Sequence, residues 1–297
     1  MKWVSRHLVQ HAHSLAREIE ARAVVVNADA LGADEDLRQL LRTVDYRSIL
    51  ITREKTPPIA QDSDWRTWVT LPNVHMTRTG QIKVALLICL AKGILERGNR
   101  VICLSGIDGS NIIDTLMVVN LGSERELLGA ADGLDLTGLD NAEVFERVLA
   151  LASQLAVEGR EGRPVGAIFV VGDADRVAAQ CRALILDPLR GYPESERNIL
   201  DPNLEETIKQ FSAMDGAFVV RDDGVVIAVG VQLVPTAQGN LLAKGLGTRH
   251  AAAAAITAST DAIAVAISES TGMVSVYRAG QMVADIHRPN NGLPGST

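Results

Sequence analysis

The sequence is poor in aromatic residues, which make up 3% of its 297 residues. Proteins that bind single-stranded nucleic acid commonly stack bases on aromatic side chains, so the composition disfavours that class. The formal net charge is −7, whereas a protein whose principal ligand is a nucleic-acid backbone is usually basic. DNA or RNA is therefore not expected as the main partner. A local basic pocket for a small phosphorylated ligand remains compatible with this charge.

Cysteine is also scarce, and Cys89, Cys103 and Cys181 form no C-x-x-C pair. Two of the three lie in apolar runs, which predicts buried free thiols in a reducing compartment. The N-terminus lacks the apolar core of a signal peptide. The longest apolar stretches contain charged residues and are too short to cross a bilayer. These absences together predict a soluble, cytoplasmic protein.

Helical and strand-like patterns alternate through the first 120 residues. The expected order is a helix over 5–22, a strand over 23–27, a helix over 35–43, strands over 48–52 and 74–77, a helix over 80–97, and strands over 101–104 and 115–120. Such alternation is typical of a three-layer α/β domain.

A connector rich in Gly, Asp and Leu follows at 122–141. The domain boundary is predicted within it, giving one domain over 1–129 and a second over 130–297. The second half has predicted helices at 142–158, 174–181, 204–214 and from Thr248 or Arg249 to about 258, and strands at 164–171, 183–186, 217–220, 225–231, 261–268, 273–277 and 282–286. Hairpins alternate here with helices, which predicts a mixed β-sheet with flanking helices.

Three polar clusters in the second half lie where an apolar run meets a turn. They are Met214-Asp-Gly-Ala217, Gly245-Leu-Gly-Thr-Arg-His250 and Ser268-Glu-Ser-Thr-Gly272. The middle cluster brings glycines, a hydroxyl and cationic side chains to a predicted helix N-terminus, where free amides and the helix dipole favour an anion. The competing interpretation is that Thr248 caps the helix and Arg249 is an ordinary surface residue.

The two flanking clusters carry acids. Asp215 could bind a divalent metal ion or accept a proton from a hydroxyl, and Gly216 would let a ligand approach the backbone closely. Glu269 follows the end of a predicted strand. Taken singly, each of these two clusters is better explained as a turn than as a site.

The order and spacing of the clusters resemble the diadenylate cyclase (DAC) domain of the DisA family, over about residues 142–288. The resemblance implies that two ATP molecules condense into cyclic di-AMP with release of two pyrophosphates. It also implies that Asp215 orients or deprotonates the attacking 3′-hydroxyl or holds Mg²⁺ or Mn²⁺. The other implied ATP contacts come from Gly216, Ala217, Leu233 (through its backbone, to adenine), Gly247, Thr248, Arg249, His250, Ser268 and Glu269, with Arg249 and His250 counted as catalytic and Glu269 as a second metal ligand.

One position departs from the family pattern, because many members have Arg after the His where this chain has Ala251. That change removes one cation from the triphosphate site. The symmetric product implies that two DAC domains, each with one ATP, meet face to face across a two-fold axis. The active form is therefore expected to be a homo-oligomer.

The first segment resembles the C-terminal α/β domain of pyruvate kinase, most clearly at 86–104 and in Ser105-Gly…Asp114-Thr-Leu-Met-Val-Val119. In pyruvate kinases that domain assembles and regulates, so the resemblance implies a fold and no activity. Such a domain before a DAC domain, with neither a membrane segment nor a helix-hairpin-helix module, is similar to the soluble archaeal-type (DacZ-like) enzymes. The alternatives are a non-catalytic sensor of ATP or cyclic di-AMP and a DNA-scanning protein. Retention of Asp215 disfavours the sensor, and the acidic charge disfavours the DNA-scanning protein.

Overall fold

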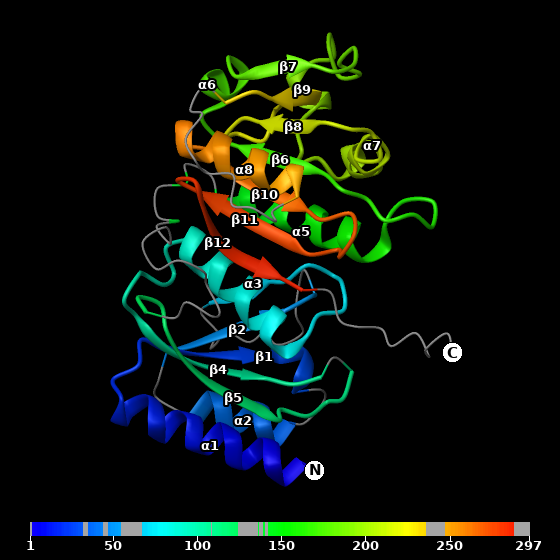
Figure 1. Cartoon of the computed structure of the whole chain (residues 1–297). Helices are drawn as coiled ribbons and strands as arrows, with labels where there is room; N and C mark the ends of the chain where they lie inside the picture. Colours follow the sequence, from blue (N-terminus) through cyan, green and yellow to red (C-terminus); the bar gives the residue numbers. More distant parts are fainter. Residues whose placement is uncertain are drawn as a thin grey trace, which may run out of the picture.

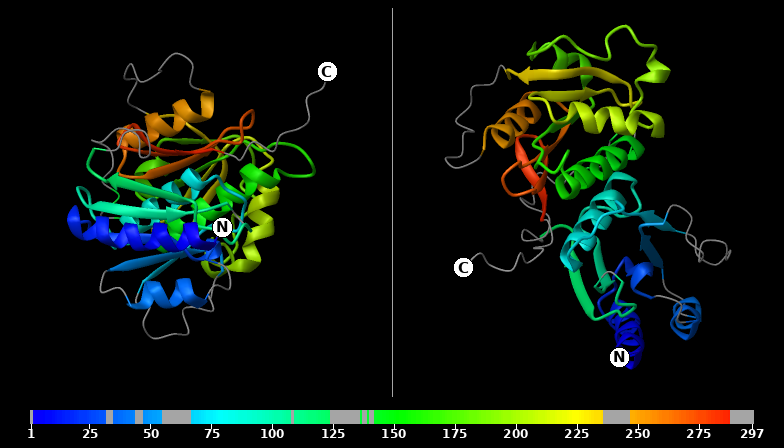
Figure 2. Two further views of the ribbon diagram at one scale, coloured as in Figure 1. Left: turned by 90° about the horizontal axis from the view of Figure 1, so that it is seen from below. Right: turned by 90° about the vertical axis from the view of Figure 1, so that its right-hand side faces the viewer.

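The computed structural model describes residues 2–31, 35–43, 47–54, 67–107, 109–123, 136, 139, 142–235 and 247–287. These residues form two β-sheets that are stacked along the long direction of the molecule, with helices between and outside them (Figure 1). A view from the side shows the same stacking (Figure 2). The α/β class predicted for both halves is confirmed.

The first sheet has five strands in the order β3-β2-β1-β4-β5. They are β1 (Ala23–Asn27), β2 (Ser48–Thr52), β3 (Trp68–Thr70), β4 (Arg100–Ser105) and β5 (Thr115–Asn120). The first four run parallel and β5 is antiparallel to β4. Helices α1 (Lys2–Glu18) and α2 (Glu35–Thr43) cover one face and α3 (Arg78–Ala91) covers the other, which confirms three layers (Figure 1).

The strand predicted at 74–77 is wrong, because the third strand is β3. Thr77 instead caps α3, its hydroxyl accepting a hydrogen bond from the Gly80 amide at 3.0 Å. The same helix was predicted to reach residue 97 and ends at Ala91. Gly93 follows with φ +63°, a left-handed conformation that glycine adopts readily and that ends an α-helix.

Buried polar side chains fix α3 over the sheet. The Asn27 amide donates to the Gln81 side-chain oxygen at 2.7 Å, and the Ser105 hydroxyl donates to the same oxygen at 2.6 Å. Asn27 ends β1 and Ser105 ends β4, so Gln81 ties two neighbouring strand ends to the first turns of the helix. All three residues are buried, where an unmade hydrogen bond would be costly.

The second sheet has seven strands in the order β12-β11-β10-β6-β8-β9-β7. They are β6 (Ile168–Val171), β7 (Cys181–Ala183), β8 (Ala217–Val220), β9 (Val226–Leu233), β10 (Ile263–Ile267), β11 (Val274–Arg278) and β12 (Gln281–Ile286). Only β6 and β8 pair in parallel, so the sheet is mixed as predicted.

Helices flank this sheet on both faces. They are α5 (Ala142–Glu158), α6 (Ala174–Ala178), α7 (Glu205–Phe211) and α8 (Thr248–Ser259). The strand predicted at 183–186 lies earlier, at β7, and α6 ends three residues before its predicted end. The helix predicted at 204–214 is shorter, because a 3₁₀ turn at Pro202–Leu204 precedes α7.

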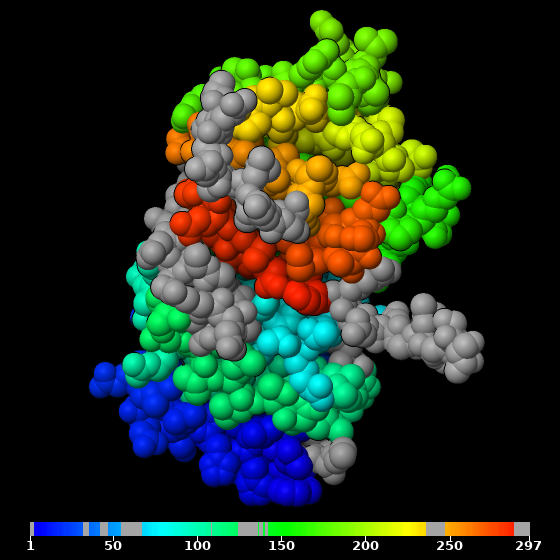
Figure 3. All heavy atoms as spheres, in the orientation of Figure 1, coloured from blue at the N-terminus to red at the C-terminus, as the bar shows by residue number. Residues whose placement is uncertain are grey.

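The two sheets share a core, since one cluster of buried apolar residues runs from the first sheet through α3 and α5 to the second. Polar contacts cross the same junction. Lys83 on α3 pairs with Asp285 on β12 at 2.6 Å, and Lys92 pairs with Glu146 on α5 at 2.5 Å. Figure 3 shows β12, in red, against the cyan surface of α3. The predicted boundary at 129/130 lies outside the described residues and stays a prediction.

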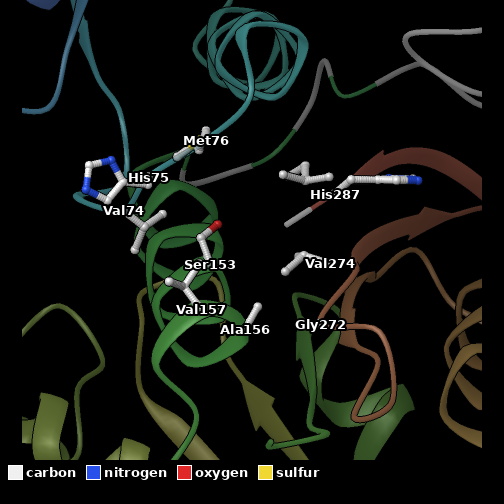
Figure 4. Close-up of a pocket in the computed structure, with 10 residues that line it drawn as sticks. Val74, His75, Met76, Ser153, Ala156, Val157, Gly272, Val274 and His287 are labelled. Carbon is white, nitrogen blue, oxygen red and sulfur yellow. The ribbon is translucent and has the colours of Figure 1, made fainter. Parts of the chain in front are cut away.

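A small apolar pocket opens at this junction (Figure 4). Its lining comes from the segment before α3, from α5, from the start of β11 with the turn before it, and from the end of β12: Val74, His75, Met76, Ser153, Ala156, Val157, Gly272, Val274, Ile286 and His287.

Cys89 and Cys103 are buried and Cys181 is half-buried, and all three are free thiols. Burial raises the pKa of the Cys89 thiol to about 12. Among the described residues, no helix is both long enough and apolar enough to cross a membrane.

Candidate active site

The register of the central strands brings the first and the third polar cluster to one edge of the second sheet. Ile168, which begins β6, lies opposite Ala217 at the start of β8 and Ala266 near the end of β10. The Ile267 amide extends this pairing by donating to the Ala167 carbonyl at 2.8 Å. The residues before β6 and β8 and those after β10 therefore meet, although they are far apart in the sequence.

Arg249 lies at the centre of this edge. Its guanidinium contacts a carboxylate oxygen of Asp215 at 3.1 Å and one of Glu269 at 3.1 Å. The Arg249 side chain is 28% exposed, whereas Asp215 is 88% and Glu269 59% exposed. The cation is thus held in place while both carboxylates keep most of their surface open to solvent. The structure brings together the acid, cation and acid that the three clusters supply.

The first turn of α8 adds backbone donors beside Arg249. Gly247, rather than Thr248, occupies the N-cap position, and glycine has no side chain with which to cap the helix. The first intrahelical bond joins the Ala251 amide to the Gly247 carbonyl, so the amides before it have no partner within the helix. The interpretation of Thr248 as the cap is therefore wrong, and its exposed hydroxyl is available to a ligand. The preceding loop residues, 236–246, lie outside the described part of the chain.

His250 differs from Arg249 because its side chain points inward. It is 7% exposed, and its Nδ1 lies 3.2 Å from the hydroxyl of Tyr277 on β11. Burial, and then the nearby Arg249 charge, lowers the pKa of the imidazole. A neutral ring at neutral pH follows, which can donate one hydrogen bond and accept another.

Gly216 and the two apolar residues predicted to contact ATP have structural roles of their own. Gly216 has φ +116°, and a Cβ there would lie 2.7 Å from the backbone of Gly230 on β9. The side chains of Ala217 and Leu233 are buried in the core, so only their backbones could meet a nucleotide. Leu233 pairs with Cys181 at the end of β9.

Ser268 closes the turn that carries Glu269. Its carbonyl accepts a hydrogen bond from the Gly272 amide at 2.8 Å, and its hydroxyl lies 3.3 Å from that of Ser270. The turn projects Glu269 from the end of β10 toward Arg249.

Gly166 is a site residue that the sequence analysis missed. A Cβ at this position would lie 2.5 Å from Nη1 and 2.6 Å from Cζ of Arg249, so the guanidinium rests on the bare backbone. The available signal was a glycine within the apolar run 164–171, because a glycine in a strand pattern often marks a close approach.

We expect Gly166→Ala to lower catalytic activity while the fold is retained. The added methyl group would displace the Arg249 side chain, which is flexible, and so separate it from Asp215 and Glu269. A loss of about tenfold to 100-fold in kcat/KM follows if geometry alone is disturbed. Steady-state kinetics with ATP measure the activity, and a thermal melt shows whether the fold is retained. Activity equal to that of the wild type would show that Arg249 does not need this position.

The acids at the edge also bear on metal binding. Among the described residues, no group of three or more His, Cys, Asp and Glu side chains converges as a ready metal site. Asp215 and Glu269 nevertheless converge on one cation, the guanidinium, and their exposed oxygens are the hard ligands that Mg²⁺ and Mn²⁺ take. The donor set fits a metal ion that gains its remaining ligands from substrate phosphates and water.

The family model described as "DisA bacterial checkpoint controller nucleotide-binding" (DAC) matches residues 154–282. The model described as "Probable sensor domain DacZ_P" matches residues 5–128. The match at 154–282 contains every predicted site residue.

The chain is also similar to whole proteins. It is 33% identical to the diadenylate cyclase of Haloferax volcanii over 242 residues, which cover 82% of this chain and 86% of the relative. It is 29% identical to the diadenylate cyclase of Methanocaldococcus jannaschii over 299 residues, which cover 94% and 96%. The chain belongs to the diadenylate cyclase family and is an enzyme of that class, which confirms the resemblance of its second half.

Two solved structures resemble parts of the chain. A double mutant of DacA from Staphylococcus aureus shares 22% identity, covers 47% of this chain and 84% of its own, and has a TM-score of 0.31. A pyruvate kinase from Cryptosporidium parvum shares 15% identity, covers 40% and 23%, and has a TM-score of 0.32.

Proposed function

We propose that this protein condenses two ATP molecules into cyclic di-AMP and releases two pyrophosphates. Family membership supports the reaction class. The observation that carries the proposal is the position of Arg249, which is held between Asp215 and Glu269 at the N-terminus of α8. A guanidinium, backbone amides without a partner within their helix and two exposed acids at one sheet edge suit a triphosphate and its metal ion.

Arg249 and the first amides of α8 bind the ATP phosphates in this proposal. The phosphates take the place of the carboxylates as partners of the guanidinium, which frees Asp215 and Glu269. Thr248 and Ser268 add hydroxyl donors, and the backbone near Leu233 contacts adenine. Ala251 supplies no charge, so Arg249 is the cation that the described residues of this turn, 247–251, provide.

The chemistry is a substitution at the α-phosphorus of each ATP. The 3′-oxygen of one nucleotide forms a bond to the α-phosphorus of the other, and the bond to pyrophosphate breaks. Asp215 orients the 3′-hydroxyl or accepts its proton. Two such steps, one on each nucleotide, close the ring.

A single DAC domain holds one ATP in this scheme, so two domains must meet face to face to give the symmetric product. Catalysis then consists mainly of positioning and charge stabilisation. The rate of cyclic di-AMP formation per enzyme molecule should fall on dilution, because dimers dissociate. A rate that stays proportional to enzyme concentration where only monomer exists would contradict the two-domain site.

A divalent metal ion completes the proposed site, because diadenylate cyclases generally need one. Asp215 and Glu269 would hold Mg²⁺ or Mn²⁺, whose charge would offset the charge of the phosphates. The N-terminal domain is proposed to serve assembly or regulation, in keeping with its match to a probable sensor domain.

The test is incubation of the purified protein with ATP and either Mg²⁺ or Mn²⁺, followed by chromatography for cyclic di-AMP and pyrophosphate. We expect one cyclic di-AMP for every two pyrophosphates, and no product when EDTA is present. Bound ATP without product would contradict the proposal and favour a nucleotide sensor. A mobility shift on duplex DNA that weakens with salt would instead favour the DNA-scanning alternative.

A further inference from the structure

Tyr277 is a buried polar residue for which the proposed reaction gives no role. It is 2% exposed and lies on β11, beneath the first turn of α8. Its hydroxyl reaches the His250 Nδ1 at 3.2 Å, with the ring centroids 6.0 Å apart. A phenol placed among the alanines and valines of this core face needs a partner, and His250 supplies it.

The contact leaves the other edge of the imidazole directed at the N-terminus of α8, where the phosphates are proposed to bind. The Nδ1 edge faces Tyr277, and Nε2 lies across the ring beside Cδ2. A Cβ built on Gly247 would be 3.8 Å from Cδ2, so the Nε2 edge faces the start of α8. Among the described residues, no hydrogen-bond partner of Nε2 is found in the protein, which leaves this nitrogen for a ligand at the helix N-terminus.

We infer that Tyr277 is a positioning residue that fixes the His250 ring with its Nε2–H directed at the nucleotide phosphates. The inference rests on the proposed function for the identity of the ligand. A phenol is the stronger acid of the pair, so its O–H donates to Nδ1 and the ring proton stays on Nε2. Burial raises the pKa of Tyr277, so the phenol keeps its proton to donate.

As a consequence, the adjacent residues Arg249 and His250 would bind the phosphates in different ways. Arg249 supplies charge and is anchored by carboxylates, whereas His250 is a neutral donor anchored from the core. Because the helix carries both, the phosphate would be bound by one charged and one uncharged side chain. The hydroxyl of Tyr277 acts on catalysis only through the orientation of His250.

The experiment uses the full-length protein and its Tyr277→Phe variant, which keeps the ring and removes the hydroxyl. Imidazole ¹⁵N spectra, assigned for His250 by comparison with His250→Gln, should show the Nε2–H tautomer in the wild type and a mixture in Tyr277→Phe. We expect kcat for cyclic di-AMP to fall about tenfold, the lower end of the effect seen when a group that orients a metal-bound imidazole is removed. Tyr192→Phe, on an exposed tyrosine, is the matched control and should change neither quantity.

A double-mutant cycle separates orientation from general stability. If Tyr277 acts through His250, Tyr277→Phe should have no further effect on kcat in the His250→Gln background. An equal loss in both backgrounds, or an Nδ1–H tautomer in the wild type, would overturn the inference. Lack of product from the wild type would overturn the proposed function instead, and the tautomer would still decide the orientation of the ring.

Discussion

Asp215→Asn should abolish the formation of cyclic di-AMP, with a loss of about 1000-fold or more, while the protein stays folded. Asparagine keeps the shape of the side chain but can neither accept the 3′-hydroxyl proton nor neutralise a metal ion. The side chain is 88% exposed, and exposed ion pairs contribute less than about 1 kcal/mol to folding. The substitution should therefore remove the product measured by chromatography and leave the melting temperature nearly unchanged.

The matched control is Asp175→Asn, which removes an exposed carboxylate from α6 in the same domain. We expect this variant to keep the activity and the melting temperature of the wild type. Product formation by Asp215→Asn at a rate near that of the wild type would exclude Asp215 from the reaction. Equal losses in both variants would point to net charge rather than to the site.

Arg249→Lys should lower kcat/KM for ATP by about 100-fold, the size of effect seen when one charge-stabilising donor is removed. Lysine keeps the positive charge but lacks the planar fork that reaches Asp215 and Glu269 together. Both the binding of ATP and its orientation should suffer, so KM should rise and kcat should fall. Initial rates over a range of ATP concentrations separate the two parameters.

Arg176→Lys is a demanding control for this substitution. Arg176 also bridges two carboxylates, Asp173 at 3.2 Å and Asp261 at 3.1 Å, but it does so on α6. We expect Arg176→Lys to leave both kinetic parameters unchanged. If Arg249→Lys were equally harmless, the phosphates would have to bind elsewhere.

Local patterns determined most elements of the fold. Apolar runs such as 23–27 and 217–220 form buried strands, because a segment too short to be a helix has few other ways to bury its apolar side chains. Local pattern predicts the third strand at 74–77, whereas it lies at 68–70. The segment 68–70 begins with an exposed Trp68, and its pairing with β2 is a non-local contact. Helix ends were also less predictable, as α3 shows.

The sequence by itself determined the chemical inventory: the acids Asp215 and Glu269, the Arg249-His250 pair at a helix start, and the spacing that the family shares. Only the tertiary structure decided how these groups relate. It placed Arg249 between both acids over Gly166, and it turned His250 inward to Tyr277. The physical reason is that strand register joins residues that are distant in the sequence. Packing, and not local pattern, decides which edge of the His250 ring faces the core.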